Sequence, residues 1–453
     1  MKIIIAGDGK VGSTLAKQLS AEGYDLTRID AKSKVLEMSE ERYDVMAVQG
    51  NCATMEALNN AKVKESDLLI AVTNADEVNL LCCLLARGMN PKIHTIARVR
   101  NPEYTKQVYD MRGLFGISMV INPEGSAALE IERLIKYPGF LKRDTFAKGR
   151  VEIVELRIES SSKLCNLTLN DLESVIKCNI LVCAVLRGGK AIAPNGFFTL
   201  KENDRIFVTA SPQNLTILLK NLGIITHKAK QVMICGGGRV SYYLAKALIG
   251  SGIAVKIIES DKDRCVQVAT LLPEADIIHG DASNEFLLES EGIAKCDVLV
   301  TLTGVDEMNT MISLYGHSCG VPQIITKIGR MENSTLLNSL PIGSIISPKS
   351  LCSNAIVRYV RALRNQAGAA RAIHYIADGQ AEAIEFLVDE NTLHCGEPLK
   401  QLHIKKNVLV ASITSGFRQT IIPNGDSVFE KGNTVLIVTS AKQVIYSLND
   451  IFE

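Results

Sequence analysis

The sequence predicts an α/β protein in which one two-domain unit occurs twice. Residues 1 to about 221 and residues 233–453 follow the same pattern at a spacing near 229 residues. The stretch Gly7-Asp8-Gly9-Lys10-Val11-Gly12 recurs as Gly236-Gly237-Gly238-Arg239-Val240-Ser241, and Asp30 recurs as Glu259. Repetition on this scale points to duplicated domains. A chain of 453 residues, 47% of them hydrophobic, suffices for three or four folded domains.

Each half opens with alternating strands and helices, the pattern of a doubly wound parallel sheet. In the first half, an apolar run at 3–6 precedes the glycines, helical spacing of apolar residues covers 13–22, and a second strand covers 24–29. Further elements are expected as strands at 45–48, 68–72 and 93–99 and a helix at 77–87, and in the second half as strands at 232–235, 255–258, 276–278, 298–302 and 324–328. We therefore predict Rossmann-like domains at 1–123 and 232–348.

An amphipathic helix is expected after Pro123 and again after Pro348. Its apolar residues recur at helical spacing, as Leu129, Ile131, Leu134 and Ile135 in one copy and Ile356, Val357, Val360 and Leu363 in the other. Such a helix covers an apolar surface, which belongs either to its own domain or to a neighbouring one. Charged stretches near 142–148 and 361–371 then lead into a smaller module.

The smaller module is also duplicated. Strands are expected at 180–185 and 408–413, ahead of Pro194-Asn195-Gly196 and Pro423-Asn424-Gly425, with final strands at 205–209 and 434–439. These triplets and Arg187-Gly188-Gly189-Lys190 are turn signals. We predict small α+β domains at 143–227 and 368–453.

The glycine loop of the first copy has the features of a pyrophosphate site. A helix that follows a tight turn directs its free N–H groups and the positive end of its dipole at the space above the turn. Gly7 permits the turn, Gly9 close approach of the backbone, and Gly12 close packing of helix on strand. Asp30, at the end of the second strand, accepts hydrogen bonds from ribose hydroxyls and repels a 2′-phosphate. This favours NAD or an adenine nucleotide over NADP, with an empty loop as the alternative.

Other candidates lie at the ends of the fourth and fifth strands. Arg98 and Arg100 share one face of a strand, where two cations suit phosphates. A solvated strand end is the alternative. Thr73 ends the fourth strand, and Asp76 and Glu77 begin the next helix, where acids either line the crevice or only stabilise the helix dipole. The second copy has these three as Thr303, Asp306 and Glu307.

The second copy departs from the first at three positions of this set. Ser241 replaces Gly12, Lys327 replaces Arg98 and Gly329 replaces Arg100, while Glu259 and the turn at 280–281 keep a ribose and base side. We therefore expect a weaker grip on phosphate and a different affinity or nucleotide choice at the second site.

Composition and charge exclude several classes of protein. A net charge of +1, from 50 basic and 49 acidic residues, gives no electrostatic footprint for nucleic acid. The amino terminus runs into a strand without the pattern of a signal peptide. Polar residues interrupt the most apolar stretch, 68–85, well before the roughly 18 apolar residues of a membrane span. The 12 cysteines are scattered without ligand spacing, which predicts buried reduced thiols in a reducing cytosol.

A catalytic set is not evident. The histidines show no ligand spacing and no motif shared with a nucleophile or paired carboxylates; they are His94, His227, His279, His317, His374, His394 and His403. We therefore predict neither catalytic residues nor a metal site, and nucleotide binding without turnover. The alternatives are a soluble NAD-dependent oxidoreductase and a nucleotide-sensing transcriptional regulator, although the basic recognition helix of the latter is not seen.

The whole chain resembles the TrkA family, the peripheral nucleotide-binding subunits of bacterial Trk potassium uptake systems. The resemblance rests on the stretches at 4–12, 72–79 and 96–100 and on the duplicated order of large and small domains, which looks like two RCK modules. It implies NAD/NADH and ATP/ADP as ligands, a homotetrameric ring beneath a membrane-embedded potassium-translocating subunit, a cytoplasmic location on the inner face of the membrane, and allosteric gating. The implied site residues are Gly7, Gly9, Lys10, Val11, Gly12, Asp30, Thr73, Asn74, Arg98 and Arg100 for the first site, with Asp8 in its loop, and Gly236, Gly237, Gly238, Arg239, Val240, Glu259 and Thr303 for the second.

Overall fold

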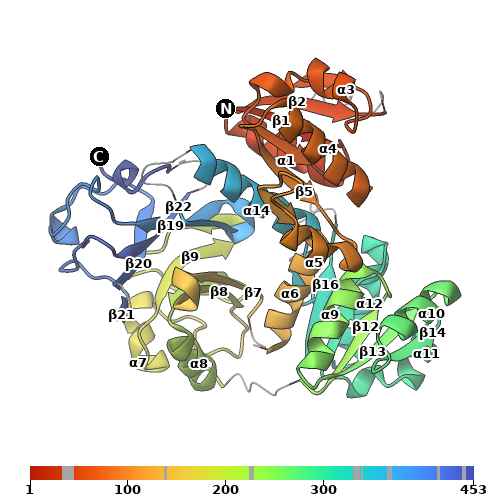
Figure 1. Cartoon of the computed structure of the whole chain (residues 1–453). Coiled ribbons are helices and arrows are strands. Elements are labelled where there is room, and N and C mark those ends of the chain that lie inside the picture. Colours follow the sequence, from red (N-terminus) through yellow and green to blue (C-terminus); the bar gives the residue numbers. More distant parts are fainter. Residues whose placement is uncertain are drawn as a thin grey trace. The chain divides into compact units, whose positions relative to one another are not determined.

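The computed structural model describes residues 1–32, 45–136, 140–223, 229–329, 337, 340–364, 370–415, 419–440 and 445–453. These residues form two six-stranded and two five-stranded sheets, in the alternating order along the chain that the duplication predicts (Figure 1). The predicted fold class is therefore confirmed. Among the helices of this described part, none is both long and apolar enough to cross a membrane. His227 lies outside the described residues.

The first sheet has the strand order β3-β2-β1-β4-β5-β6. Its strands are β1 (Lys2–Ala6), β2 (Asp25–Asp30), β3 (Met46–Gln49), β4 (Leu68–Ala71), β5 (His94–Arg98) and β6 (Met119–Ile121). Its helices are α1 (Lys10–Ala21), α3 (Met55–Asn60), α4 (Asp76–Met89) and α5 (Pro102–Asp110), and α1 and α4 contact the sheet (Figure 1). The strand order reverses between β1 and β4, both of which pair in parallel. Ligands of such sheets bind beyond the carboxyl ends of the strands at this point.

The third sheet repeats this order as β14-β13-β12-β15-β16-β17. Its strands are β12 (Gln231–Cys235), β13 (Ala254–Glu259), β14 (Asp276–His279), β15 (Val298–Thr301), β16 (Gln323–Lys327) and β17 (Ser344–Ile346). Its helices are α9 (Arg239–Gly250), α10 (Lys262–Leu271), α11 (Glu285–Ser290) and α12 (Asp306–Ser318). The short strands β6 and β17 were not expected, because three residues are too few to show a periodic pattern.

Each small domain is an antiparallel sheet with its last strand in the middle. The first consists of β7 (Lys142–Phe146), β8 (Val151–Arg157), β9 (Leu181–Arg187), β10 (Lys190–Ile192) and β11 (Arg205–Ala210), with α7 (Leu172–Ile176) and α8 (Pro212–Asn221). The second consists of β18 (Ala372–Ile376), β19 (Ala381–Leu387), β20 (Val408–Ser415), β21 (Gln419–Ile421) and β22 (Thr434–Ser440). Gly188 and Gly189 both have positive φ, 56° and 76°, as the tight β9–β10 turn requires.

The charged segments that enter the small domains contain regular structure where they are described. Residues 142–146 of the first stretch form β7, which belongs to the sheet and pairs with β8. Arg361 is 3% exposed and pairs with Glu382. A buried ion pair can therefore give a strand or helix the composition of a linker.

The two small domains share one apolar core. Side chains of both sheets form a single buried cluster that includes Phe146, Phe207, Ile376 and Leu436. At its edge, Asp144 Oδ1 lies 2.7 Å from His374 Nδ1. These two residues occupy matching positions of β7 and β18, so the two copies contact each other through equivalent strands, as in a two-fold symmetric dimer.

The chain divides into two compact units. The first unit contains Met1–Glu130, Gly237–Ala247 and Ile346–Val357, and the second unit contains Ile131–Gly236, Leu248–Ile345 and Arg358–Glu453. The amphipathic helices are α6 (Pro123–Lys136) and α14 (Pro348–Arg364). Much of α14 thus groups with the first Rossmann-like domain, and Leu134 O of α6 accepts a hydrogen bond from Gln323 Nε2 of the second domain (2.9 Å). Each helix therefore groups partly with its own Rossmann-like domain and partly with a neighbouring domain, so both alternatives are observed.

One member of the expected apolar stripe of α6 is wrong. Leu129 is 55% exposed, whereas Ile131, Leu134 and Ile135 are buried together with Ala127 and Ala128. Two alanines thus belong to the buried face, and a pattern drawn from large residues alone assigned Leu129 to it in their place.

Candidate functional site

The first glycine loop is a tight connection between β1 and α1. Gly7 has φ +101°, and a Cβ there would lie 2.8 Å from the backbone N of Thr73. A Cβ on Gly12 would lie 2.0 Å from Gly7 O. Both positions therefore require glycine, one for the approach of β4 and one for the packing of α1.

Gly9 differs from the other two glycines because it faces open space. No atom lies within 4 Å of a Cβ built on it, and its φ of −73° is allowed for any residue. Gly9 caps α1, which begins at Lys10, so the first backbone N–H groups of the helix are directed toward this space. Val11 is buried against the domain. The side chain of Lys10 lies outside the described atoms.

Asp30 lies against the loop, where a ribose-binding acid is expected. Its Oδ2 accepts a hydrogen bond from the backbone N of Asp8 (2.7 Å), and its Oδ1 accepts one from the backbone N of Lys32 (2.9 Å). Each carboxylate oxygen has a second lone pair for a ligand hydroxyl.

Asp8 forms an ion pair with Arg28 inside the domain. Asp8 is 4% exposed and Arg28, on β2, is 0% exposed. Asp8 therefore shapes the loop from within. Sequence analysis missed Arg28, although the comparison of the two copies contains the signal: Asp8 and Arg28 become Gly237 and Ile257 at the same spacing, so both charges are lost together.

A buried asparagine fixes the end of β4 in both copies. Asn79 is 0% exposed; its Oδ1 accepts hydrogen bonds from Thr73 N (2.8 Å) and Thr73 Oγ1 (2.7 Å), and its Nδ2 donates to Arg98 O (2.9 Å). Asn309 makes the same bonds to Thr303 at 2.8 and 2.7 Å. Neither asparagine was predicted, although each follows its threonine by six residues.

Arg98 and Arg100 converge on Asn74, as the strand pattern predicts, but their guanidinium groups are bonded to protein oxygens. Arg98 is 7% exposed and donates to Thr73 O and to Asn74 Oδ1 (3.2 Å). Arg100 donates to Asn74 O and lies 3.4 Å from Asp76 Oδ1. Burial, followed by the neighbouring Arg100, lowers the pKa of Arg98. The described site thus holds two cations beside the loop: Arg98 on backbone and amide oxygens, and Arg100 on a backbone oxygen and the Asp76 carboxylate.

The acids at the starts of α4 and α12 position the adjoining loops. Asp76 Oδ2 accepts hydrogen bonds from the backbone N of Arg100 and of Asn101, both at 2.7 Å. In the second copy, Asp306 Oδ1 accepts from the backbone N of Gly329 at 2.9 Å. Of the two roles left open for Asp76 and Asp306, these bonds favour the structural one. Glu77 and Glu307 are exposed.

The strand ends of the second copy repeat those of the first. Gly236 has φ +104°, and a Cβ there would lie 2.9 Å from Leu302 O. Lys327 Nζ donates to the same carbonyl at 3.2 Å, in place of an arginine. Glu259 Oε1 accepts a hydrogen bond from the backbone N of Asp261 (2.8 Å).

The start of α9 belongs to the first unit and carries the rest of the second loop. Gly237 and Val240 are buried, Arg239 is exposed, and a Cβ on Gly238 would have no atom within 4 Å. Ser241 is 0% exposed. A Cβ at the matching Gly12 would meet Gly7 O at 2.0 Å, so serine stands here where the first loop requires glycine.

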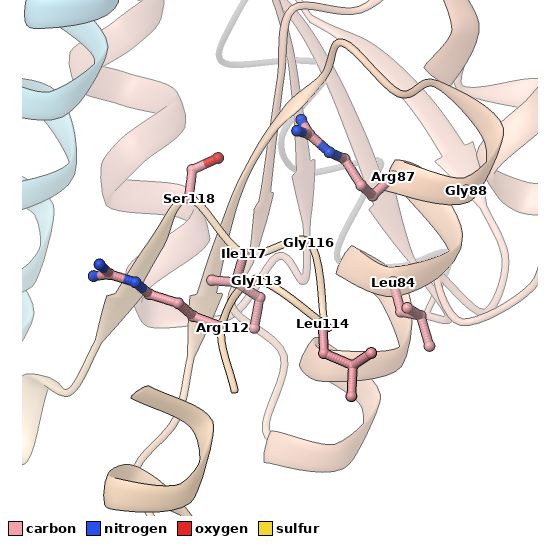
Figure 2. Close-up of a pocket in the computed structure, with 9 residues that line it drawn as sticks. All are labelled: Leu84, Arg87, Gly88, Arg112, Gly113, Leu114, Gly116, Ile117 and Ser118. Atoms are coloured by element: carbon pink, nitrogen blue, oxygen red, sulfur yellow. The ribbon is translucent and has the colours of Figure 1, made fainter. Parts of the chain in front are cut away.

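A separate pocket of about 370 Å³ lies in the first unit and shares no residue with the glycine loop. Figure 2 shows that the guanidinium groups of Arg87 and Arg112 on its wall do not converge on a common point. Arg87 instead donates to Ile93 O, and the exposed Leu84 and Leu114 supply apolar surface. This pocket lacks the anion-binding character of the loop.

The fold and the loop define a protein with two tandem Rossmann-like domains of the nucleotide-binding type, each joined to a small antiparallel domain. The TrkA-N domain model matches residues 3–123 and 232–348, and the TrkA-C domain model matches residues 153–223 and 383–449. The chain therefore belongs to the TrkA family.

Full-length relatives support the same assignment. The chain is 31% identical to Trk system potassium uptake protein TrkA of Haemophilus influenzae, covering 100% of this chain and 99% of that protein. It is 32% identical to the TrkA homolog of Archaeoglobus fulgidus, covering 100% of both. A TrkA homolog of Methanosarcina mazei is 31% identical over 97% of this chain and 98% of that protein.

Solved structures share the fold. The RCK domain of GsuK superposes with a TM-score of 0.63 at 16% identity, covering 97% of this chain and 92% of that chain. The GsuK channel bound to NAD gives a TM-score of 0.63 at 16% identity, covering 97% of this chain and 77% of that chain. These structures thus share the fold of the chain.

Proposed function

We propose that this chain is the cytosolic regulatory subunit of a Trk-type potassium uptake system and that nucleotide at the first glycine loop controls the attached transporter. One observation carries the proposal: the loop has open space at Gly9, in front of the amino end of α1, with the Asp30 carboxylate bonded to its backbone. The family supports the potassium system, because relatives that match the full length of the chain carry that name.

The proposed ligands are NAD/NADH and ATP/ADP. Their pyrophosphate or phosphates would lie against Gly7, Gly9 and the start of α1, and a ribose hydroxyl would donate to Asp30, which disfavours a 2′-phosphate. The other proposed contacts of the first site are Lys10, Val11, Gly12, Thr73, Asn74, Arg98 and Arg100. Asp8 acts through the shape of the loop. The second site would use Gly236, Gly237, Gly238, Arg239, Val240, Glu259 and Thr303.

The bonds of the two arginines suggest how binding becomes a conformational signal. Arg98 and Arg100 donate to the carbonyl oxygens of Thr73 and Asn74. A phosphate oxygen is a stronger acceptor than a neutral carbonyl. Nucleotide would therefore draw Arg98 away from Thr73 O, and Arg100 away from Asn74 O, and so release the β4 end; the Asp76 carboxylate, which also pairs with Arg100, would compete for that guanidinium. A ligand that binds one arrangement of this edge more tightly shifts the population toward that arrangement.

The ionisable groups around the loop favour binding over turnover. Asp8 is paired with Arg28, Asp76 with the backbone after β5, and Asp30 with the backbone of the loop. Each is bonded to a partner inside the protein, whereas hydride transfer needs an acid or base that can exchange a proton with substrate. A soluble NAD-dependent oxidoreductase remains the second candidate, and it predicts substrate-dependent absorbance change at 340 nm.

The assembly forms part of the proposal. Four chains with two modules each would form an eight-module ring on the cytoplasmic face of the membrane, beneath a membrane-embedded potassium-translocating subunit. Nucleic acid is not a proposed partner, because the net charge of +1 offers no basic surface. Co-purification of a polytopic membrane protein with the full chain tests the partner, and light scattering of the purified chain tests the tetramer.

The site itself is tested by Gly9→Asp against Gly9→Ala. Both side chains fit the apo loop, because space is open and φ is ordinary, but only aspartate places a negative charge where phosphate would lie. We expect Gly9→Asp to abolish first-site binding of NADH or ATP in calorimetry and the nucleotide response of potassium flux. Gly9→Ala should lose far less. A Gly9→Asp protein that folds, binds and responds like the parent would overturn the proposal.

A further inference from the structure

Tyr243 connects the helix of the second glycine loop to the nucleotide crevice of the first. It is the fifth residue of α9, which begins at Arg239 directly after Gly236-Gly237-Gly238. Its hydroxyl donates a hydrogen bond to Arg100 O (3.0 Å) and accepts one from Asn122 Nδ2 (2.9 Å). All three residues belong to the first unit. A helix that starts at one predicted site thus contacts the strand end of the other.

The contact continues into the first crevice through Arg100. The backbone N of Arg100 donates to Asp76 Oδ2 at 2.7 Å, and its guanidinium donates to Asn74 O. The backbone carbonyl that Tyr243 holds belongs to the same residue. A displacement of the Tyr243 hydroxyl therefore changes the position of a cation that we propose as a phosphate ligand.

Asn122 extends the contact to the start of α6. Its Nδ2 donates to the Tyr243 hydroxyl, and its Oδ1 accepts a hydrogen bond from the backbone N of Gly125 at 2.9 Å. Thr105 Oγ1 of α5 lies 3.4 Å from the same hydroxyl. One phenol oxygen thus contacts Arg100, two residues beyond β5, as well as Asn122 before α6 and a residue of α5.

The arrangement is specific to one copy. The residue of α1 that matches Tyr243 is Thr14, which is much shorter. The cation at this contact is also specific, because Gly329 stands where the first copy has Arg100. The two copies have therefore diverged at both ends of the contact, the hydroxyl and the arginine that it holds.

We propose that Tyr243 is a positioning residue that transmits occupation of the second glycine loop to the first nucleotide crevice. Phosphate at the amino end of α9 would bind the first N–H groups of the helix and fix its position. Tyr243, one turn further on, then sets the position of Arg100. This inference rests on the proposed nucleotide binding and adds the direction of communication: the second loop controls the affinity of the first.

The test uses the full chain with the first loop blocked. In a Gly9→Asp protein, added ATP or NADH can bind only at the second loop, and hydrogen exchange of the backbone around 98–105 then reports on the empty first crevice. We expect ATP or NADH to slow exchange in this segment. Adding Tyr243→Phe, which removes only the hydroxyl, should abolish this slowing. The Kd of the second loop, measured by calorimetry, should change by less than about twofold, which is well below the factor of about 5 or more that is typical of coupling between two sites.

Tyr242→Phe is the matched control, because it removes a hydroxyl from the neighbouring residue of the same helix and keeps the ring, which packs edge-on against Tyr243. It should keep the exchange response. A second comparison uses the chain with an intact first loop, in which Gly238→Asp blocks the second loop. With Tyr243 present, Gly238→Asp should change the Kd of the first site; with Tyr243→Phe, it should leave that Kd unchanged.

Two results would overturn the inference. One is slowed hydrogen exchange at 98–105 that persists in the Gly9→Asp, Tyr243→Phe double variant, or the absence of any slowing in Gly9→Asp alone, where only the second loop can be occupied. The other is a Gly9→Asp chain that binds neither ATP nor NADH, which leaves the second loop without a ligand. The proposed function fails separately, when a Gly238→Asp chain with its intact first loop also binds neither nucleotide.

Discussion

The buried pair of Asp8 and Arg28 makes a quantitative prediction, because the second copy provides its natural replacement. The side chains of Arg28 and Asp8 are 0% and 1% exposed, so Asp8→Gly leaves a guanidinium charge in the interior. Breaking such a pair from one side costs about 3–5 kcal/mol. Asp8→Gly together with Arg28→Ile copies Gly237 and Ile257, and apolar replacement of a buried pair is often neutral or stabilising.

We therefore expect Asp8→Gly to destabilise the first Rossmann-like domain by about 3–5 kcal/mol. The free energy of unfolding of the double variant should lie within about 1 kcal/mol of that of the parent, and the added glycine itself accounts for roughly 0.5–1 kcal/mol of this difference. Arg28→Ile alone leaves the Asp8 carboxylate buried without its partner and should cost a similar amount, so the double variant should be far less destabilised than the sum of its two single variants.

Native-state hydrogen exchange of the β1 and β2 amides is the suitable assay. The chain contains no tryptophan, and a chain of several domains does not unfold in one two-state step, whereas exchange reports the opening free energy of each element in the full chain. Ile257→Arg alone is the matched control: it introduces the same charge into the second copy, where Gly237 supplies no carboxylate, and should destabilise β13. A double variant as unstable as Asp8→Gly would refute the reasoning.

Three further outcomes are expected. Asn79→Ala should cost about 3 kcal/mol of opening free energy at β4 and β5, because it leaves several buried backbone groups unsatisfied at roughly 1–3 kcal/mol each, as hydrogen exchange would measure. Ser241→Gly should tighten nucleotide binding at the second loop in calorimetry, because it restores the residue that the tight first loop requires. Asp144→Asn should destabilise the contact between the small domains by about 2 kcal/mol at neutral pH. Burial opposes ionisation of Asp144, but Lys142 and His374 outweigh burial and lower the pKa of the carboxyl in the folded protein. The stability that Asp144 contributes is therefore fully present above its unfolded pKa, near 4, and is lost as the pH falls toward its folded pKa. Circular dichroism should show this loss for the parent between about pH 5 and 2, and should not show it for Asp144→Asn.

The sequence predicted the fold because its strongest signals are local and occur twice. Apolar runs that end in glycines identified β1 and β12, and the tight Gly188-Gly189 turn was predicted from its residues alone. The missed elements have weak local signals. In β8 the apolar residues are interrupted by Glu152 and Glu155, which are buried beside arginines of the neighbouring strands, as Glu155 is by Arg205. A glutamate on such a strand looks solvent-exposed until its partner is known.

The candidate site was predicted to a similar extent. Glycines and acids at fixed spacing identify a loop, because the backbone of a tight turn constrains residue type directly. What the sequence of one copy could not predict is which polar groups are bonded to one another. Arg98 was expected to be available for phosphate, yet it donates to Thr73 O, and Asn79, which holds that threonine, carries no motif. Long-range partners of buried polar groups follow from tertiary structure.

Comparison of the two copies supplies part of that missing information. Positions that change together, such as Asp8 with Arg28, indicate a contact, because a buried charge without its partner is costly. Positions that stay together, such as Thr73 with Asn79 and Thr303 with Asn309, indicate a shared structural requirement. By the same reasoning, both copies keep the threonine and asparagine that fix the ends of β4 and β15, whereas the residues around the proposed phosphate position differ between the copies. Two loops that differ in this way can respond to different nucleotides, and a link such as Tyr243 then lets one chain compare them.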